Sequence, residues 1–125
     1  MSTKIHDLAS QAILGVGLAP QTVTASINGN GGDLQDGDSR CFAIQQVGTV
    51  SGTTPTLAGK IQESSDNATW SDIANATFTS VTASNNYQAI TFDRSKRYVR
   101  YVGTIGGTSP SYALAVVISE QRKQV

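Results

Sequence analysis

The sequence predicts an all-β fold: a single antiparallel β-sandwich, jelly-roll-like, with an N-terminal arm or short helix. Apolar and polar residues alternate from Gln21 onward, apolar runs of strand length recur, and Gly, Pro, Asn and Ser separate them. A chain of 125 residues is long enough for one domain with its own core. We therefore expect an arm or helix at 1–20, the sandwich domain at 21–120 and a C-terminal tail at 121–125.

The first segment has a different period from the rest of the chain. Apolar residues recur at the spacing of an amphipathic helix, which predicts a helix over residues 3–13. A helix of this length is marginal alone, so its apolar stripe must dock on the chain's own sheet or on a neighbouring subunit. The candidate interface residues here are Ile5, Leu8, Ile13 and Leu14.

Short strands are expected along the remainder of the chain. Val23, Ala25 and Ile27 alternate with polar residues, and the run Asn28–Gly32 ends that strand. Further strands are expected at 41–50, 56–63, 69–74, 87–92, 97–105 and 111–119. The expected core residues are Trp70, Phe92, Leu114, Val116, and Tyr98 or its neighbour Val99.

Two segments of the chain repeat each other at an offset of 55 residues. Val47–Pro55 and Val102–Pro110 match at six of nine positions. In each copy we expect a strand to end, Gly to supply a turn, and Pro to start the next strand. The two resulting hairpins would then place their loops at related ends of the sandwich. The alternative is that two common Gly-Thr-Ser-Pro turns match by chance.

The last expected strand is apolar on both of its faces. Tyr112, Leu114, Val116 and Ile118 share one face, and Ala113, Ala115 and Val117 share the other. A strand with one solvated face would alternate apolar with polar residues, so we expect both faces to be covered. One cover is the core, and the other is the N-terminal helix or a neighbouring subunit. Ala113, Ala115 and Val117 are therefore further candidate interface residues.

Composition and motifs argue against several function classes. The net charge is zero and only 14% of residues are charged, so no field attracts nucleic acid. No apolar run approaches the roughly 20 residues of a membrane span. His6 is the only histidine, and no metal cluster, phosphate loop or nucleophile motif accompanies it. We expect no enzyme and no cofactor, with Cys41 a packed thiol rather than a nucleophile.

Two polar segments allow a functional interpretation beside a structural one. Asp33, Asp36 and Asp38 lie in a Gly-bearing loop and form a weak calcium candidate, although the spacing is not that of an EF-hand. Carboxylates that stabilise turns are the favoured alternative. In the hairpin around Asp66 and Asn67, those residues are expected to fix the turn. Trp70 is then a core residue, or alternatively stacks on a sugar.

The segment Asn28–Ser39 resembles one that opens many small structural proteins of tailed bacteriophages. There, a Gly-rich turn and an Asp-Leu pair precede a strand ending in Val-Gly, the place taken here by Phe42–Gly48. The hairpin Ile61–Asp66 with a following Trp70 is also similar. The resemblance spans about residues 13–119 and implies a capsid decoration (cement) protein on the virion's capsid surface. Its partners would be the major capsid protein and itself, as a homotrimer in preference to a dimer.

A second, weaker resemblance is to discoidin-like jelly-roll domains. It is carried by Ser64–Ile73 and by Arg97–Arg100. The chain lacks the paired cysteines and aromatic loops of those domains. This resemblance implies the alternative function, a carbohydrate-binding or host-attachment module on the head or tail.

Overall fold

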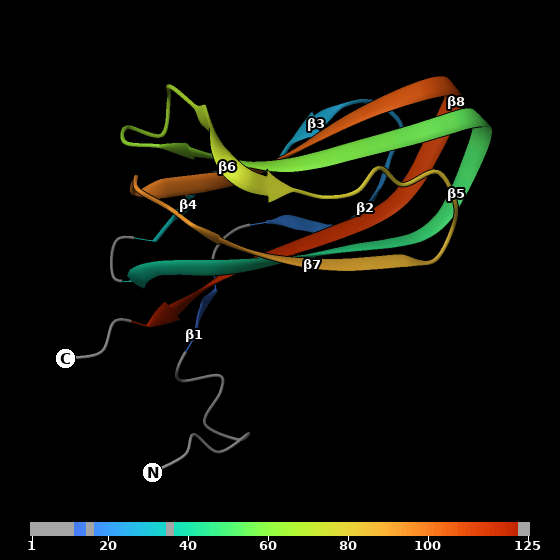
Figure 1. The fold of residues 1–125 in the computed structure, drawn as a ribbon. Helices are drawn as coiled ribbons and strands as arrows, with labels where there is room; N and C mark the ends of the chain where they lie inside the picture. Colours follow the sequence, from blue (N-terminus) through green and yellow to red (C-terminus); the bar gives the residue numbers. More distant parts are fainter. Residues whose placement is uncertain (1–11, 15–16, 35–36, 123–125) are drawn as a thin grey trace, which may run out of the picture.

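The structure is a computed structural model that describes residues 12–14, 17–34 and 37–122. These residues form strands and no helix, so the predicted all-β class is confirmed (Figure 1). The strands are β1 (Ala12–Leu14), β2 (Leu18–Val23), β3 (Ile27–Asn28), β4 (Gly32–Asp33), β5 (Gly37–Ser64), β6 (Ser71–Thr77), β7 (Asn86–Asp93) and β8 (Tyr98–Arg122). All eight belong to one hydrogen-bonded antiparallel sheet.

Two very long strands, β5 and β8, form the centre of the sheet. They pair antiparallel from Gly37↔Arg122 to Ser64↔Tyr98. The sequence predicted two separate strands in each of these segments, with turns near Pro55 and Pro110. That prediction is wrong, because β5 continues past Pro55, β8 continues past Pro110, and the two strands stay paired as one ribbon.

The β5–β8 ribbon bends back on itself, and the bend makes a sandwich from a single sheet (Figure 1). We call the two halves layer I and layer II. Layer I contains the first half of β5 and the second half of β8, flanked by β7 on one side and by β1 and β2 on the other. Layer II contains the other two halves, flanked by β6 and by β3 and β4.

The bend is built from two β-bulges that face each other. Thr53 pairs with Thr108 at the centre, and the register shifts on both sides of this pair. On one side Gly52 lies opposite Ser109 and Pro110, and on the other Gly107 lies opposite Thr54 and Pro55. A bulge bends its strand and strengthens the local twist, so two opposed bulges turn the whole ribbon.

The repeated sequence segments coincide with these bulges. Gly52 and Gly107 have φ values of +114° and +107°, and Thr54 and Ser109 have φ values of 47° and 49°. The two copies therefore adopt the same backbone geometry, as expected from their shared sequence. They do not form the two predicted hairpin turns, since each instead forms half of one bend.

The core lies between the layers. Layer I contributes Ala43, Val47, Tyr112, Leu114, Val116 and Ile118, and layer II contributes Leu57, Ile61, Val99 and Tyr101. The predicted core residues Phe92, Val99, Leu114 and Val116 are buried, as expected. Trp70 is only half-buried and is absent from this core, so the prediction for that residue is wrong.

The N-terminal segment is described only in part. Most of the predicted helix over residues 3–13 lies outside the described residues, but its last two residues, Ala12 and Ile13, belong to β1. They pair with Gln121 and Glu120 of β8. The helix therefore does not extend through residue 13.

We predict that Gly52→Ala and Gly107→Ala each destabilise the fold by about 1–3 kcal/mol, the usual cost of holding an L residue in a disfavoured backbone region. A Cβ at either position would also lie 2.6–2.7 Å from a backbone oxygen of the opposite strand. Urea unfolding of the purified variants measures the loss.

The matched control is Gly106→Ala in the same bend. Its Cβ would meet only the Thr56 hydroxyl, at 2.8 Å, and that side chain is free to rotate. Equal losses for Gly106→Ala and Gly107→Ala would contradict the role assigned to the left-handed glycines.

Candidate functional site

The outer face of layer I is the most apolar exposed surface of the described residues. Phe42, Tyr87 and Val117 are their exposed large hydrophobic side chains, with exposed fractions of 39%, 71% and 44%. All three point away from the core on this one face, since their neighbours along each strand point inward. The face also carries Ile44, Gln46, Ala89, Thr91, Ala113 and Ala115.

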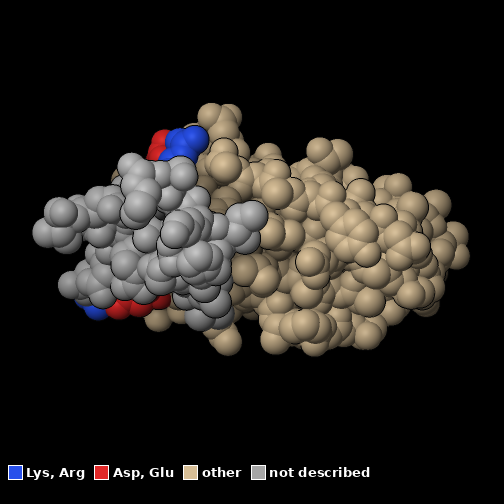
Figure 2. Space-filling model, turned by 90° about the horizontal axis from the view of Figure 1, so that it is seen from below, with Lys and Arg blue, Asp and Glu red and all other residues tan. Residues whose placement is uncertain are grey.

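This outer face of layer I carries no charged residue between Phe42 and Gly48, Tyr87 and Thr91, or Ala113 and Val117. Figure 2 views the molecule from below, onto this face, and shows charged atoms only toward one end. A paired Arg40 and Asp93 lie at the end of the neighbouring strands β5 and β7. A continuous exposed apolar surface without charge is typical of a contact surface between proteins.

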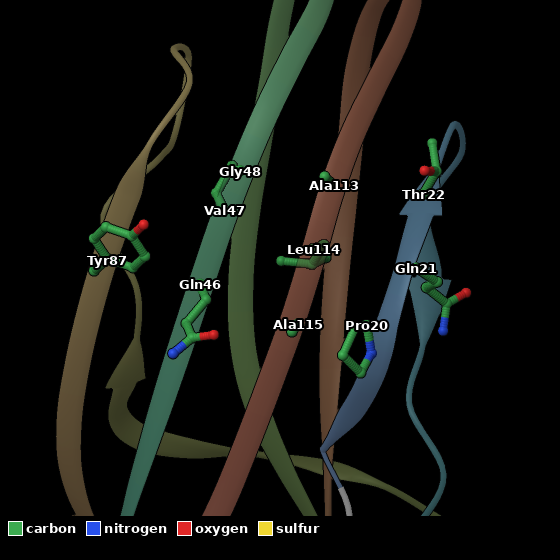
Figure 3. Close-up of a pocket in the computed structure, with 10 residues that line it drawn as sticks. All are labelled: Pro20, Gln21, Thr22, Gln46, Val47, Gly48, Tyr87, Ala113, Leu114 and Ala115. Atoms are coloured by element: carbon green, nitrogen blue, oxygen red, sulfur yellow. The ribbon is translucent and has the colours of Figure 1, made fainter.

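The same face is hollowed by a groove of about 400 Å³ (Figure 3). Ala113 and Ala115 lie between Gln46 and Tyr87 on one side and Pro20 on the other. The groove exists because β8 presents only methyl groups here, while its neighbours carry larger side chains. The predicted interface residues Ala113, Ala115 and Val117 thus share one outward face, opposite the buried row from Tyr112 to Ile118.

The outer face of layer II is polar and its groups bond to one another. The Arg100 guanidinium donates to the side-chain oxygen of Gln62 at 2.8 and 3.0 Å, and the side-chain NH2 group of Gln62 donates to Asp72 at 2.8 Å. Lys60 pairs with the same Asp72 carboxylate at 3.1 Å. The hydrogen bond from Gln62 and the nearby Lys60 hold the pKa of Asp72 below its usual range.

Trp70 belongs to this polar outer face of layer II. The guanidinium of Arg100 lies over its ring, 4.6 Å from the centroid, and a cation in this position is attracted by the ring's electrons. Sequence periodicity could not find this contact, because the strand pattern places Trp70 near the core without revealing the partner from β8.

A buried ionic cluster closes the end of the sandwich opposite the bend. Arg94 forms an ion pair with Glu120, and their side chains are only 8% and 0% exposed. Arg94 also donates to the backbone carbonyls of Leu34 and Lys96, which ties three segments together. Cys41 lies against the same carboxylate, with its sulfur 3.4 Å from a Glu120 oxygen.

Burial and the neighbouring Glu120 carboxylate raise the pKa of the Cys41 thiol far above its ordinary value. A neutral, buried thiol is a poor nucleophile, because the thiolate is the reactive form. This agrees with the expectation that Cys41 is a packing residue.

A second buried polar contact lies in the middle of the core. The Tyr101 hydroxyl donates to the Gln45 side-chain oxygen at 2.6 Å, and both residues are fully buried. Burial raises the pKa of the Tyr101 hydroxyl. Gly59 and Gly103 leave the room for this pair, since a Cβ at Gly59 would lie 2.3 Å from the Gln45 oxygen.

The calcium candidate receives no support from the described residues. The Asp33 carboxylate accepts two hydrogen bonds from Arg97, at 2.7 and 2.9 Å. Asp36 lies outside the described residues, and Asp38 falls in β5 with its side chain not described. Elsewhere in the described residues, no three His, Cys, Asp or Glu side chains gather in a way that would hold a metal ion.

The turn chemistry expected around Asp66 is present. Its carboxylate accepts hydrogen bonds from the backbone N–H groups of Ala68 and Thr69, both at 2.9 Å, and from the Ser64 hydroxyl. These bonds hold the pKa of Asp66 below its usual range. Asn67 follows in the left-handed region, with a φ of 60°.

Of the N-terminal interface candidates, Ile5 and Leu8 lie outside the described residues. Ile13 and Leu14 belong to β1, beside Glu120 and Ser119 of β8, and their side chains are not described. Their part in an interface stays a prediction. The described residues include no helix that could span a membrane.

Comparison with known proteins finds a similar fold among solved structures. No protein-family model and no curated protein matches the chain. Among solved structures, the chain is similar to the crystal structure of the PBSX exported protein XepA, with a TM-score of 0.63 and 20% sequence identity. The match covers 99% of this chain and 41% of the XepA chain. At this identity the likeness establishes a shared fold, with this chain spanning less than half of XepA.

We predict that Arg94→Met costs about 3–5 kcal/mol of stability, because it removes the guanidinium that forms an ion pair with the buried Glu120 carboxylate. Arg40→Met is the matched control. It breaks the Arg40–Asp93 pair, whose side chains are 59% and 69% exposed, and should cost no more than about 1 kcal/mol. Denaturant titration of both variants checks the difference, and equal losses would contradict it.

Proposed function

We propose that this chain is a non-enzymatic structural protein of a tailed-phage virion, and more narrowly a capsid decoration protein. In this proposal it lies on the capsid surface and stabilises the head shell. The uncharged outer face of layer I, with its Ala113–Ala115 groove, is the surface that binds the major capsid protein. The observation that carries the proposal is the gathering of Phe42, Tyr87 and Val117 on that one face.

The physical argument is the contrast between the two outer faces. Removing the layer I face from water gains hydrophobic free energy and leaves no charge unpaired. The polar groups of the layer II face already bond to one another, so that face is suited to solvent. Many copies on one shell would add the contacts together without any catalytic chemistry.

The phage assignment has two supports of different kinds. The sequence segments Asn28–Ser39 and Ile61–Trp70 resemble small structural proteins of tailed phages. A similar solved structure is that of the PBSX exported protein XepA, which is consistent with a phage protein. Because fold likeness does not transfer function, the capsid location and the major capsid protein as partner rest on the sequence resemblance. That resemblance also favours a homotrimer over a dimer.

The half-buried position of Trp70 favours a second candidate, a carbohydrate-binding or host-attachment module. Its indole, stacked with Arg100 on the polar outer face of layer II, offers the aromatic and hydrogen-bonding groups that sugars contact. The two candidates use opposite faces of the sandwich. Trp70→Ala would abolish glycan binding in the second and leave shell binding unchanged in the first.

We predict that Ala115→Glu abolishes binding to phage heads assembled without this chain. Burying an unpaired carboxylate costs several kcal/mol, and about 1.4 kcal/mol already weakens binding tenfold. Because the Ala115 side chain points out of the core, the isolated variant should unfold at the wild-type temperature. Co-sedimentation with heads measures binding.

Ala58→Glu is the control for this experiment. Ala58 is an exposed alanine on β5 in layer II, so the same change is made on the opposite face. It should bind as wild type does. Normal binding by Ala115→Glu, or equal loss by both variants, would show that the layer I face is not the shell contact.

A further inference from the structure

The strands at the edges of the two layers differ in how well they could pair with a strand of another chain. A strand at the edge of a sheet presents a row of unpaired N–H and C=O groups, which can pair with a strand of another chain. In layer I the edges are β7 and the strands β1 and β2, and in layer II they are β6 and the strands β3 and β4. Proteins usually interrupt such edges with prolines, bulges, charges or short strands.

The other edges are interrupted in these ways. β2 contains Pro20, and its register with β8 shifts between Leu18 and Gln21. β6 pairs irregularly with β5 and contains Asn75, whose φ is 63°. β1 has three residues, and β3 and β4 have two each. None of these edges offers a long regular row of backbone groups.

The β7 edge is different. It runs for eight residues in unbroken register with β5, from Asn86↔Val47 to Asp93↔Arg40. From Asn86 to Phe92 it contains no charged residue and no proline. Within the described part of the chain, β5 is the only strand that pairs with β7. In Figure 3, β7 is accordingly the outermost strand beside the groove.

One hydrogen bond fixes which groups of β7 point outward. The Asn85 N–H donates to the Gly48 carbonyl at 2.8 Å, so Gly48 and Asn85 are a hydrogen-bonded pair. Hydrogen-bonded pairs alternate along an antiparallel ladder, so Tyr87, Ala89 and Thr91 bond to β5. Gln88 and Ile90 therefore direct their backbone N–H and C=O groups toward the open edge.

The β7 strand is also held in place from the inside. The Gln88 side chain accepts a hydrogen bond from the Thr79 N–H and donates one to the Thr79 carbonyl, each at 2.8 Å. These two bonds attach β7 to the edge of layer II. The open edge is thus a rigid template, which reduces the ordering cost of adding a strand to it.

We propose that the β7 edge pairs with β7 of a second copy of this chain, antiparallel and about a two-fold axis at Ala89. An uncharged strand meets its own copy without like-charge repulsion, as a two-fold interface requires. Centring on Ala89 pairs the whole uncharged stretch 86–92 and leaves the Asp93 carboxylates outside the ladder. On the outer face Tyr87 then lies opposite Thr91 of the second copy, a favourable aromatic to β-branched pair.

This pairing also joins the two outer faces of layer I side by side. Ala89 has neighbours on that face in Ile44 and Val117, which lie in the same row across the sheet. The dimer would present one uncharged face twice as wide as that of a single copy. The inference does not depend on what binds there, and it replaces the trimer expected from the resemblance with a dimer.

The test is an Ala89→Cys substitution in the full chain. In the proposed register the two Ala89 residues form a non-hydrogen-bonded pair with Cα atoms about 4.5 Å apart. That separation suits a disulfide. With oxidised glutathione as the oxidant, this variant should form a reducible dimer at low protein concentration. Cys41 is 1% exposed and so does not compete in the folded protein.

Ala58→Cys is the control, because Ala58 is exposed on β5 in layer II and not on the β7 edge of layer I. It should cross-link much more slowly. Sedimentation of the wild-type chain should give a dimer, which Ala89→Lys dissociates and Ala58→Lys does not, since an edge lysine blocks strand addition.

Equal cross-linking of the two cysteine variants would overturn the proposal. So would a wild-type monomer or a trimer, since two-fold pairing of the β7 edge joins the copies in pairs. All these measurements use the free protein without phage heads. A result that contradicts the dimer is therefore distinguishable from a result that contradicts shell binding, which Ala115→Glu tests.

Discussion

The fold depends on one constraint, the bend in the β5–β8 ribbon. A ribbon of this length left straight would expose both of its faces to water. The opposed bulges at Gly52 and Gly107 fold it in half, so that Leu57 and Tyr101 of layer II pack against Tyr112 and Leu114 of layer I. The remaining strands then add to edges that the bend has already created. Because each glycine lies against the opposite strand's Thr-Pro or Ser-Pro pair, the two halves of the bend are geometrically equivalent.

A consequence of the bend is that the two outer faces differ in chemistry although they belong to the same strands. Along β5, the outward residues before the bend are Phe42, Ile44 and Gln46, and those after it are Ala58, Lys60 and Gln62. The first set joins apolar neighbours on β7 and β8. The second set joins Arg100 and Asp72 in a hydrogen-bonded network. One sheet thereby has a polar outer face and an apolar outer face.

Sequence patterns predicted the all-β class and the burial of Phe92, Val99, Leu114 and Val116, because alternation with a period of two depends only on neighbouring residues. They predicted two hairpin turns at the bend, since the segments Gly52–Pro55 and Gly107–Pro110 are compatible with a turn or with a bulge. The difference depends on a strand 55 residues away. The same limit explains Trp70, whose position is set by Arg100 from β8. It also explains the Arg94–Glu120 pair, whose partners are 26 residues apart in the chain. The outward row Ala113, Ala115 and Val117 was found because both faces of one strand were apolar.

The pKa shifts in the described residues reflect how their polar groups are used in the fold. The pKa values are raised for Cys41, Tyr101 and Tyr112, and lowered for Asp66 and Asp72. Each is explained by burial or by turn and cross-strand hydrogen bonds that maintain the fold. These polar groups thus stabilise the sandwich. The described residues also present an apolar outer face on layer I and, at β7, a strand edge that pairs with no described strand except β5.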